Sequence, residues 1–326
     1  MRRCAASKRS IDRALRGSLL AAIASASSAL AQERTPGFGD PLLGRWDLTI
    51  EGEDAPYPSW LEVRLRTERE LMARFVGRVG SVRHAGVIDY EDGRLELVVP
   101  AQYETGQAEL EFRGRLVGEG LEGTTTAADG DALRWIGVRA PSLIRNVDQK
   151  TGAPIALVTD GGLAGWKPRS ADNAGCWTVA SGELAATPPC VDLVTEATFD
   201  DFALHAELQY PPGSNSGIYL RGRYEVQISD DAGKALDPLR MGAVYGFIAP
   251  SVDAARAANE WQTLDVTLRG RHVTVVLNGT TIIDGQEIPG ITGGALDSRE
   301  GEPGSIMLQG DHGPIRFRNL VLTPYR

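Results

Sequence analysis

Polar side chains of several types are concentrated in one short stretch, residues 215–230, which has the pattern of two strands separated by Gly222. Side chains alternate between the two faces of a strand, so the apolar residues of this stretch share one face. The opposite, polar face is expected to carry Asn215, Tyr219, Arg221, Glu225 and Gln227. A ring, a guanidinium, a carboxylate and amides so close together are typical of a surface that recognises a hydroxylated ligand. A merely solvated strand face is the alternative.

A second group that could do chemistry is a loop histidine, His312, which lies next to Asp311 between two glycines. It could act as a base or bind a metal ion, with Asp311 orienting or charging it. The alternative is a structural or merely exposed loop histidine. No metal-binding spacing such as H-x-x-x-H accompanies it. No cofactor is therefore evident, and a divalent metal ion held between Glu225 and His312 stays open.

The elements that must position these groups are predicted to be strands throughout. Eight short candidate strands lie between residues 43 and 138, with turns at residues 91–93, 118–120 and 128–130. This predicts a small antiparallel β-barrel over residues 40–140, since closure of the sheet removes exposed edges. The first candidate strand carries Gly44-Arg45-Trp46, which resembles the G-x-W opening of lipocalin-like barrels.

A linker is predicted at residues 141–154, which begin and end with proline, and strand patterns return from residue 155 to residue 326. Some 170 residues of antiparallel strands without a long helix are typical of a two-sheet sandwich. We therefore expect an all-β chain in which a barrel precedes a sandwich.

Four ordered motifs in this second part resemble the 3-keto-disaccharide hydrolase family. They are residues 215–227, Asn259-Glu-Trp-Gln-Thr263, Leu277-Asn-Gly279 and residues 308–319. The segments at residues 160–166 and 192–195 are similar to that family too. The resemblance implies a concanavalin A-like jelly-roll sandwich whose concave sheet binds carbohydrate. It also implies cleavage of glycosides that are already oxidised to a ketone at sugar carbon 3.

Such a ketone acidifies the proton on carbon 2, so a base can remove it and the carbon 1 substituent can leave by elimination, with water adding afterwards. The chemistry requires one base, an acid or water at the leaving oxygen, and a group that stabilises the enolate. Glu225 is the leading catalytic carboxylate, Arg221 or a metal ion would stabilise the enolate, and His312 is the alternative base. Substrate binding is assigned to a further set of aromatic and amide residues: Asn215, Tyr219, Gln227, Tyr245, Trp261 and Gln309. For Trp261 a place in the core is an equally good interpretation.

Two other functions remain as alternatives. A retaining glucanase needs two carboxyl groups roughly 5 Å apart. Gln227 stands where glucanases of the same parent fold carry a middle acid. Asp230 is an odd step from Glu225, so without a bulge it faces the other way. A conventional glucanase is therefore disfavoured. A non-catalytic, lectin-like carbohydrate-binding protein would need the aromatic and amide residues but not Glu225.

The first 31 residues have the features of a signal peptide: a basic start, a small apolar run over residues 17–30, and an A-x-A cleavage site. The run is too short and too rich in serine and alanine for a membrane anchor. We expect an exported, periplasmic or secreted protein without membrane insertion. Without this segment 28 basic and 42 acidic residues remain, a net charge of −14, which makes nucleic acid an improbable partner. The two remaining cysteines, Cys176 and Cys190, are expected to form one disulfide, with two buried thiols as the alternative.

Overall fold

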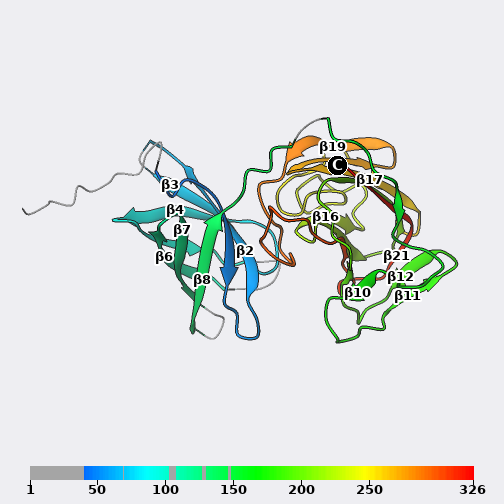
Figure 1. The fold of residues 1–326 in the computed structure, drawn as a ribbon, viewed down its shortest axis with the longest axis horizontal. Helices are drawn as coiled ribbons and strands as arrows, with labels where there is room; N and C mark the ends of the chain where they lie inside the picture. Colours follow the sequence, from blue (N-terminus) through cyan, green and yellow to red (C-terminus); the bar gives the residue numbers. More distant parts are fainter. Residues whose placement is uncertain (1–39, 69, 103–107, 127–129, 146–147) are drawn as a thin grey trace, which may run out of the picture. The chain divides into compact units, whose positions relative to one another are not determined.

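The computed structural model describes residues 40–68, 70–102, 108–126, 130–145 and 148–326 (Figure 1). The signal peptide predicted at residues 1–31 lies outside the described residues. Within these ranges every regular element is a β-strand. No helix there has the length and hydropathy that crossing a membrane requires.

The first eight strands close into an antiparallel barrel in chain order, as the strand count predicted. Its strands are β1 (Gly44–Ile50), β2 (Tyr57–Leu65), β3 (Leu71–Val76), β4 (Arg83–Glu91), β5 (Arg94–Val99), β6 (Leu110–Val117), β7 (Gly120–Thr126) and β8 (Ala132–Arg139). The interior is filled by buried side chains, including Trp46, Phe75, Phe112 and Trp135. At the β4–β5 hairpin, Asp92 and Gly93 both have positive φ (49° and 76°), which is the requirement of a type I′ turn.

The second part of the chain is a sandwich of two sheets, which confirms the predicted all-β fold class. One sheet has five strands in the order β10 (Trp166–Pro168), β13 (Leu193–Thr195), β20 (Met307–Leu308), β15 (Asn215–Leu220) and β16 (Tyr224–Ser229). The other runs β11 (Trp177–Ala180), β12 (Glu183–Ala186), β21 (Ile315–Pro324), β14 (Phe202–Gln209), β17 (Gln262–Arg269), β18 (His272–Leu277) and β19 (Thr280–Glu287), with β9 (Ile155–Ala156) beside β21.

The five-stranded sheet divides its side chains between two faces. Ile218, Val226 and Ile228 point to the inner face and belong to the large apolar cluster that fills the space between the sheets. Tyr219 and Glu225 point to the opposite face. This alternation follows from the pleat of a strand, and it leaves the outer face of β15 and β16 free to carry polar groups.

A disulfide joins Cys176 to Cys190 with a Cα–Cα distance of 5.3 Å, so the expected pairing is confirmed. The bond lies beside the five-stranded sheet, where Trp177 Nε1 donates a hydrogen bond of 2.6 Å to the carbonyl oxygen of Val191. A Cβ atom at Gly310 would lie only 3.1 Å from Cys190 Sγ and 2.4 Å from the Val191 carbonyl oxygen. The disulfide therefore packs directly against the backbone that leads to His312.

Candidate active site

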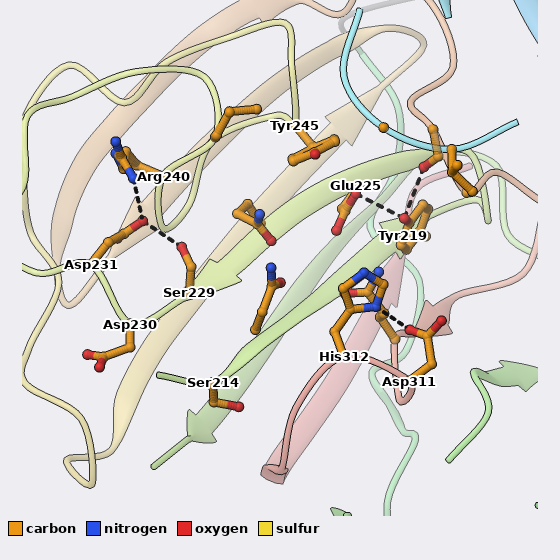
Figure 2. Close-up of a pocket in the computed structure, with 18 of the residues that line it drawn as sticks. Ser214, Tyr219, Glu225, Ser229, Asp230, Asp231, Arg240, Tyr245, Asp311 and His312 are labelled. Atoms are coloured by element: carbon orange, nitrogen blue, oxygen red, sulfur yellow. Dashed lines mark hydrogen bonds and ion pairs between the residues drawn. The ribbon is translucent and has the colours of Figure 1, made fainter. Parts of the chain in front are cut away.

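A pocket of about 530 Å³ lies on the outer face of the five-stranded sheet, within the usual range of ~300–1,000 Å³ for ligand pockets. Figure 2 shows its lining, with Glu225 between Tyr219 and Tyr245. Seven of the nine residues proposed from the sequence line this one pocket: Asn215, Tyr219, Glu225, Gln227, Tyr245, Gln309 and His312. The strand pattern and the loop motifs thus converge on one place in the fold.

The pairing of β15 with β16 places the central groups. Tyr219 lies directly opposite Glu225, and Gly217 lies directly opposite Gln227. The Glu225 side chain occupies the space above Gly217, since a Cβ atom there would be 2.4 Å from Glu225 Oε1 and 2.9 Å from its Cγ. A glycine at position 217 is therefore what gives the carboxyl group its place in the pocket.

Glu225 is the most strongly perturbed carboxyl group of the pocket. It is only 4% exposed, and burial raises its pKa to about 8. The hydroxyl of Tyr219 donates a hydrogen bond of 2.9 Å to Glu225 Oε2, which together with the nearby His312 holds that pKa lower than burial alone would. The same hydroxyl lies 3.0 Å from the carbonyl oxygen of Gly293. Glu225 is thus poised to exchange a proton near neutral pH.

His312 and Asp311 form a second charged unit at the pocket, as Figure 2 shows. His312 Nδ1 lies 2.5 Å from Asp311 Oδ1, and this hydrogen bond is the main reason that the pKa of His312 is raised above 6.5. The same contact lowers the pKa of Asp311. Since Nδ1 is engaged, Nε2 is the ring nitrogen left to serve a ligand.

Sequence reasoning missed two residues that hold this end of the pocket, Arg169 and Asp192. The carboxylate of Asp192 accepts a hydrogen bond of 2.9 Å from Arg169 Nη1 and one of 3.1 Å from the backbone N–H of Gly310. A signal for Asp192 existed, because it opens one of the segments that carry the family resemblance. Arg169 directly follows the short strand β10 and has no comparable signal in the sequence.

The predicted place of Arg221 on the polar face is wrong. Strand β15 ends at Leu220, and Arg221 has a φ of 53°, so the alternation of the strand stops before its side chain. The guanidinium is fully buried, and its donors bind Asp200 Oδ1 at 3.1 Å and the Gly270 carbonyl oxygen at 2.6 Å. Arg221 is absent from the pocket lining and takes no further part in the chemistry proposed below.

Trp261 also lies outside the pocket lining, so the structure does not bring it together with the other residues assigned to substrate binding. It directly precedes β17 of the other sheet, and the guanidinium of Arg318 stacks over its ring at 3.8 Å. Conversely, Asp230 does reach the pocket, because it lies one residue beyond the end of β16 and strand alternation no longer applies. Its carboxylate accepts a hydrogen bond of 2.8 Å from the Gly213 N–H.

The pocket continues away from His312 toward a group of polar side chains at the end of β16. There Ser229 Oγ donates a hydrogen bond of 2.7 Å to Asp231 Oδ2, and Arg240 pairs with Asp237 at 2.7 Å. Figure 2 shows Arg240 turned toward Asp231, away from Tyr219 and His312. The two ends of the pocket therefore carry separate charged groups, with Glu225 between them.

The sequence left open whether a metal ion is held between Glu225 and His312. Both residues line the same pocket. In the part of the chain that the structure describes, however, no group of three His, Cys, Asp or Glu side chains is arranged to hold a metal ion. The carboxylates nearest to His312 are already engaged: Asp311 by the imidazole, and Asp192 by Arg169 and the Gly310 N–H.

The chain was compared with known proteins. Two crystal structures of proposed glycosyl hydrolases from Parabacteroides distasonis ATCC 8503 are similar. One shares 26% identity over 56% of this chain and 92% of its own length, with a TM-score of 0.45. The other shares 18% identity over 54% of this chain and 99% of its own, with a TM-score of 0.43. A comparison with curated proteins found no match. Residues 154–323 match the model of the 3-keto-alpha-glucoside-1,2-lyase-like domain, and the chain therefore belongs to that family.

Proposed function

We propose that this protein cleaves glycosides whose sugar is oxidised to a ketone at carbon 3, by elimination across carbons 1 and 2 followed by addition of water. The family description supports this substrate class. The observation that carries the proposal is the buried carboxyl group of Glu225 in the pocket, hydrogen-bonded by Tyr219, whose pKa of about 8 suits proton transfer near neutral pH.

Glu225 is the base in this proposal. Its ionised carboxylate takes the proton from carbon 2, and the electron pair of the broken C–H bond moves onto the ketone oxygen as an enolate. Desolvation raises the pKa of Glu225, and a carboxylate of higher pKa is the stronger base toward a carbon acid. Tyr219 keeps one oxygen of the carboxyl group fixed, which leaves Oε1 as the atom that receives the proton.

His312 is the acid. Its Nδ1 contact with Asp311 favours the imidazolium form, so Nε2 carries a proton to donate. When the enolate collapses, a double bond forms between carbons 1 and 2 and the bond from carbon 1 to the leaving oxygen breaks. The electron pair goes to that oxygen, which takes the proton from His312.

Water completes the reaction. Its hydroxyl adds to carbon 1 and a proton returns to carbon 2, so the net change is hydrolysis of the glycoside with the ketone retained. Glu225, now protonated, is the donor for carbon 2, and neutral His312 removes the proton of the attacking water. Each residue returns to its starting state, and no oxidant or reductant is consumed.

Double displacement by two carboxylates is the competing mechanism, and the geometry argues against it. Apart from Glu225, the carboxylates that line the pocket each have at least one oxygen held by a donor group of the protein: Asp192, Asp230, Asp231 and Asp311. A retaining glycosidase needs a second carboxyl group about 5 Å from the first, whereas the side chain that contacts Glu225 here is the hydroxyl of Tyr219.

The test is to incubate the purified protein with 3-keto-trehalose and, in parallel, with unoxidised trehalose, and to measure released sugar. Turnover of the oxidised substrate alone is expected, with Glu225→Gln about 100- to 10,000-fold slower, the usual contribution of a catalytic proton-transfer group. If neither sugar is cleaved but Glu225→Gln binds trehalose as wild type does in calorimetry, the protein is a carbohydrate-binding module instead.

The proposal includes export, based on the features of residues 1–31. N-terminal sequencing of the mature protein from a native culture is expected to begin at Gln32. A cytoplasmic protein that retains Met1 would contradict this part of the proposal and leave the chemistry untouched.

A further inference from the structure

An enolate carries a negative charge, and the proposed chemistry requires a fixed cation or donor at the ketone oxygen. Of the groups assigned to that task from the sequence, Arg221 lies outside the pocket. Four other basic side chains line it: Arg169, Lys234, Arg240 and His312. His312 already serves the leaving group in our proposal, so the remaining three are the candidates.

Two of these three belong to the far end of the pocket. Lys234 Nζ donates a hydrogen bond of 3.0 Å to the carbonyl oxygen of Asp230. Arg240 is held by Asp237 and by the carbonyl oxygen of Ala235, its Nε lying 3.0 Å from the latter. Both side chains thus contact residues of the segment after β16, away from Tyr219.

Arg169 belongs to the end of the pocket where Glu225, Tyr219 and His312 meet. Its Nη1 donates to the Gly294 carbonyl oxygen at 3.0 Å and its Nη2 to that of Ala295 at 3.3 Å. These two carbonyls follow directly on Gly293, whose own carbonyl oxygen accepts from Tyr219. Asp192, the carboxylate partner of Arg169, also accepts from the Gly310 N–H of the loop that carries His312, so the contacts of the guanidinium lead to the partner of the base on one side and to the loop of the acid on the other.

The guanidinium is anchored but not saturated. It has five N–H donors, and the contacts to Asp192, Gly294 and Ala295 use three of them. Within the part of the chain that the structure describes, the other two have no protein acceptor of oxygen or nitrogen. The side chain is 38% exposed at the pocket, whereas Asp192 beneath it is buried. The contact with buried Asp192 fixes the orientation of the guanidinium before substrate binds. Such a fixed donor is what electrostatic stabilisation of a transition state requires.

We propose that Arg169 is a catalytic residue that donates to the ketone oxygen at carbon 3 and stabilises the enolate formed when Glu225 removes the carbon 2 proton. Asp192 is then a positioning residue: one oxygen holds the guanidinium and the other holds the Gly310 N–H of the loop that carries His312. This inference rests on the function proposed above.

The test compares wild type with Arg169→Gln and Arg169→Lys on 3-keto-trehalose. Loss of one oxyanion donor slows catalysis about 100- to 1,000-fold, so Arg169→Gln is expected to lower kcat by that factor with KM changed about threefold or less. Arg169→Lys keeps a positive charge but lacks the planar set of guanidinium donors, and its kcat is expected to be roughly tenfold lower than that of wild type. The matched control is Arg299→Gln, an arginine outside the pocket that pairs with Asp297 and is 65% exposed; it is expected to stay within about twofold of wild type.

A substrate deuterated at carbon 2 separates enolate stabilisation from a structural role. If Arg169 stabilises the enolate, C–H cleavage becomes more rate-limiting in Arg169→Gln and the isotope effect on kcat increases. A structural role would raise KM and lower the unfolding temperature without changing the isotope effect, and that result would overturn the proposal. Should Arg169→Gln fail to fold, Arg169→Lys decides: a kcat equal to that of wild type refutes it. Wild type inactive on 3-keto-trehalose would refute the proposed function, whereas active wild type with unaffected Arg169 variants would refute only this inference.

Discussion

Replacing Tyr219 by phenylalanine removes the hydrogen bond that stabilises the ionised form of Glu225, so the pKa of Glu225 is expected to rise above about 8. Hydrogen bonds to charged groups contribute ~1.5–3 kcal/mol. The single hydroxyl proton of Tyr219 is shared with the Gly293 carbonyl oxygen, so the lower end of that range applies. About 1.4 kcal/mol corresponds to one pH unit, which places the new pKa near roughly 9.

The assay is the pH dependence of kcat/KM, whose rising limb reports the base of the free enzyme. At pH 7 the ionised fraction of Glu225 would fall from about one in ten to about one in a hundred, and kcat/KM would fall about tenfold with it. The deficit should shrink as the pH approaches 9. A ¹³C titration of the Glu225 carboxyl carbon measures the same change without substrate.

The matched control is Tyr224→Phe. Tyr224 is the neighbour of Glu225 in β16 but points to the opposite face, where its hydroxyl donates to Glu300 Oε1 at 2.6 Å. The Tyr224→Phe variant should be less stable than wild type, but the rising limb of its kcat/KM profile should stay near pH 8. A limb that stays at pH 8, or moves to lower pH, in Tyr219→Phe would refute the assignment of Glu225 as the base that Tyr219 supports.

Further expectations concern the same pocket. Gly217→Ala should lower kcat about 100-fold, because its Cβ atom would lie 2.4 Å from Glu225 Oε1 and displace the carboxyl group; near-wild-type kcat would contradict this. Asp311→Asn should lower the pKa of His312 and move the falling limb of the pH profile to lower pH. The pKa of Glu225 is about 8 in the fold against an ordinary 4.5, so folding stability is lost as pH rises through this range, by up to roughly 4–5 kcal/mol. Glu225→Gln should remove this loss in denaturant melts at pH 5 and pH 9.

Local rules predicted the parts of this fold that depend on neighbouring residues. The two-residue period of β15 and β16 placed Tyr219, Glu225 and Gln227 on one face, and the pairing of these strands brought them together. The closed barrel followed from the number of short strands and from turns such as Asp92-Gly93.

The errors lie where the backbone leaves the strand. Arg221 was predicted to follow the alternation of β15, but its positive φ turns the side chain into the protein, and no local pattern separates that turn from a continuing strand. Arg169 and Asp192 reach the pocket through contacts with residues more than a hundred positions away, such as Gly294 and Gly310. Such contacts are set by how the strands are ordered in the sheet, which a sequence pattern does not encode.

The disulfide beside the pocket has a practical consequence for anyone who makes this protein. Cys190 is followed by Val191 and then by Asp192, the residue that holds both Arg169 and the loop of His312. Material produced in a reducing cytoplasm would differ in mass by only two hydrogen atoms, yet it would lack the cross-link next to Asp192. Two preparations of one sequence can thus give different specific activities, and a count of free thiols should accompany every measured rate.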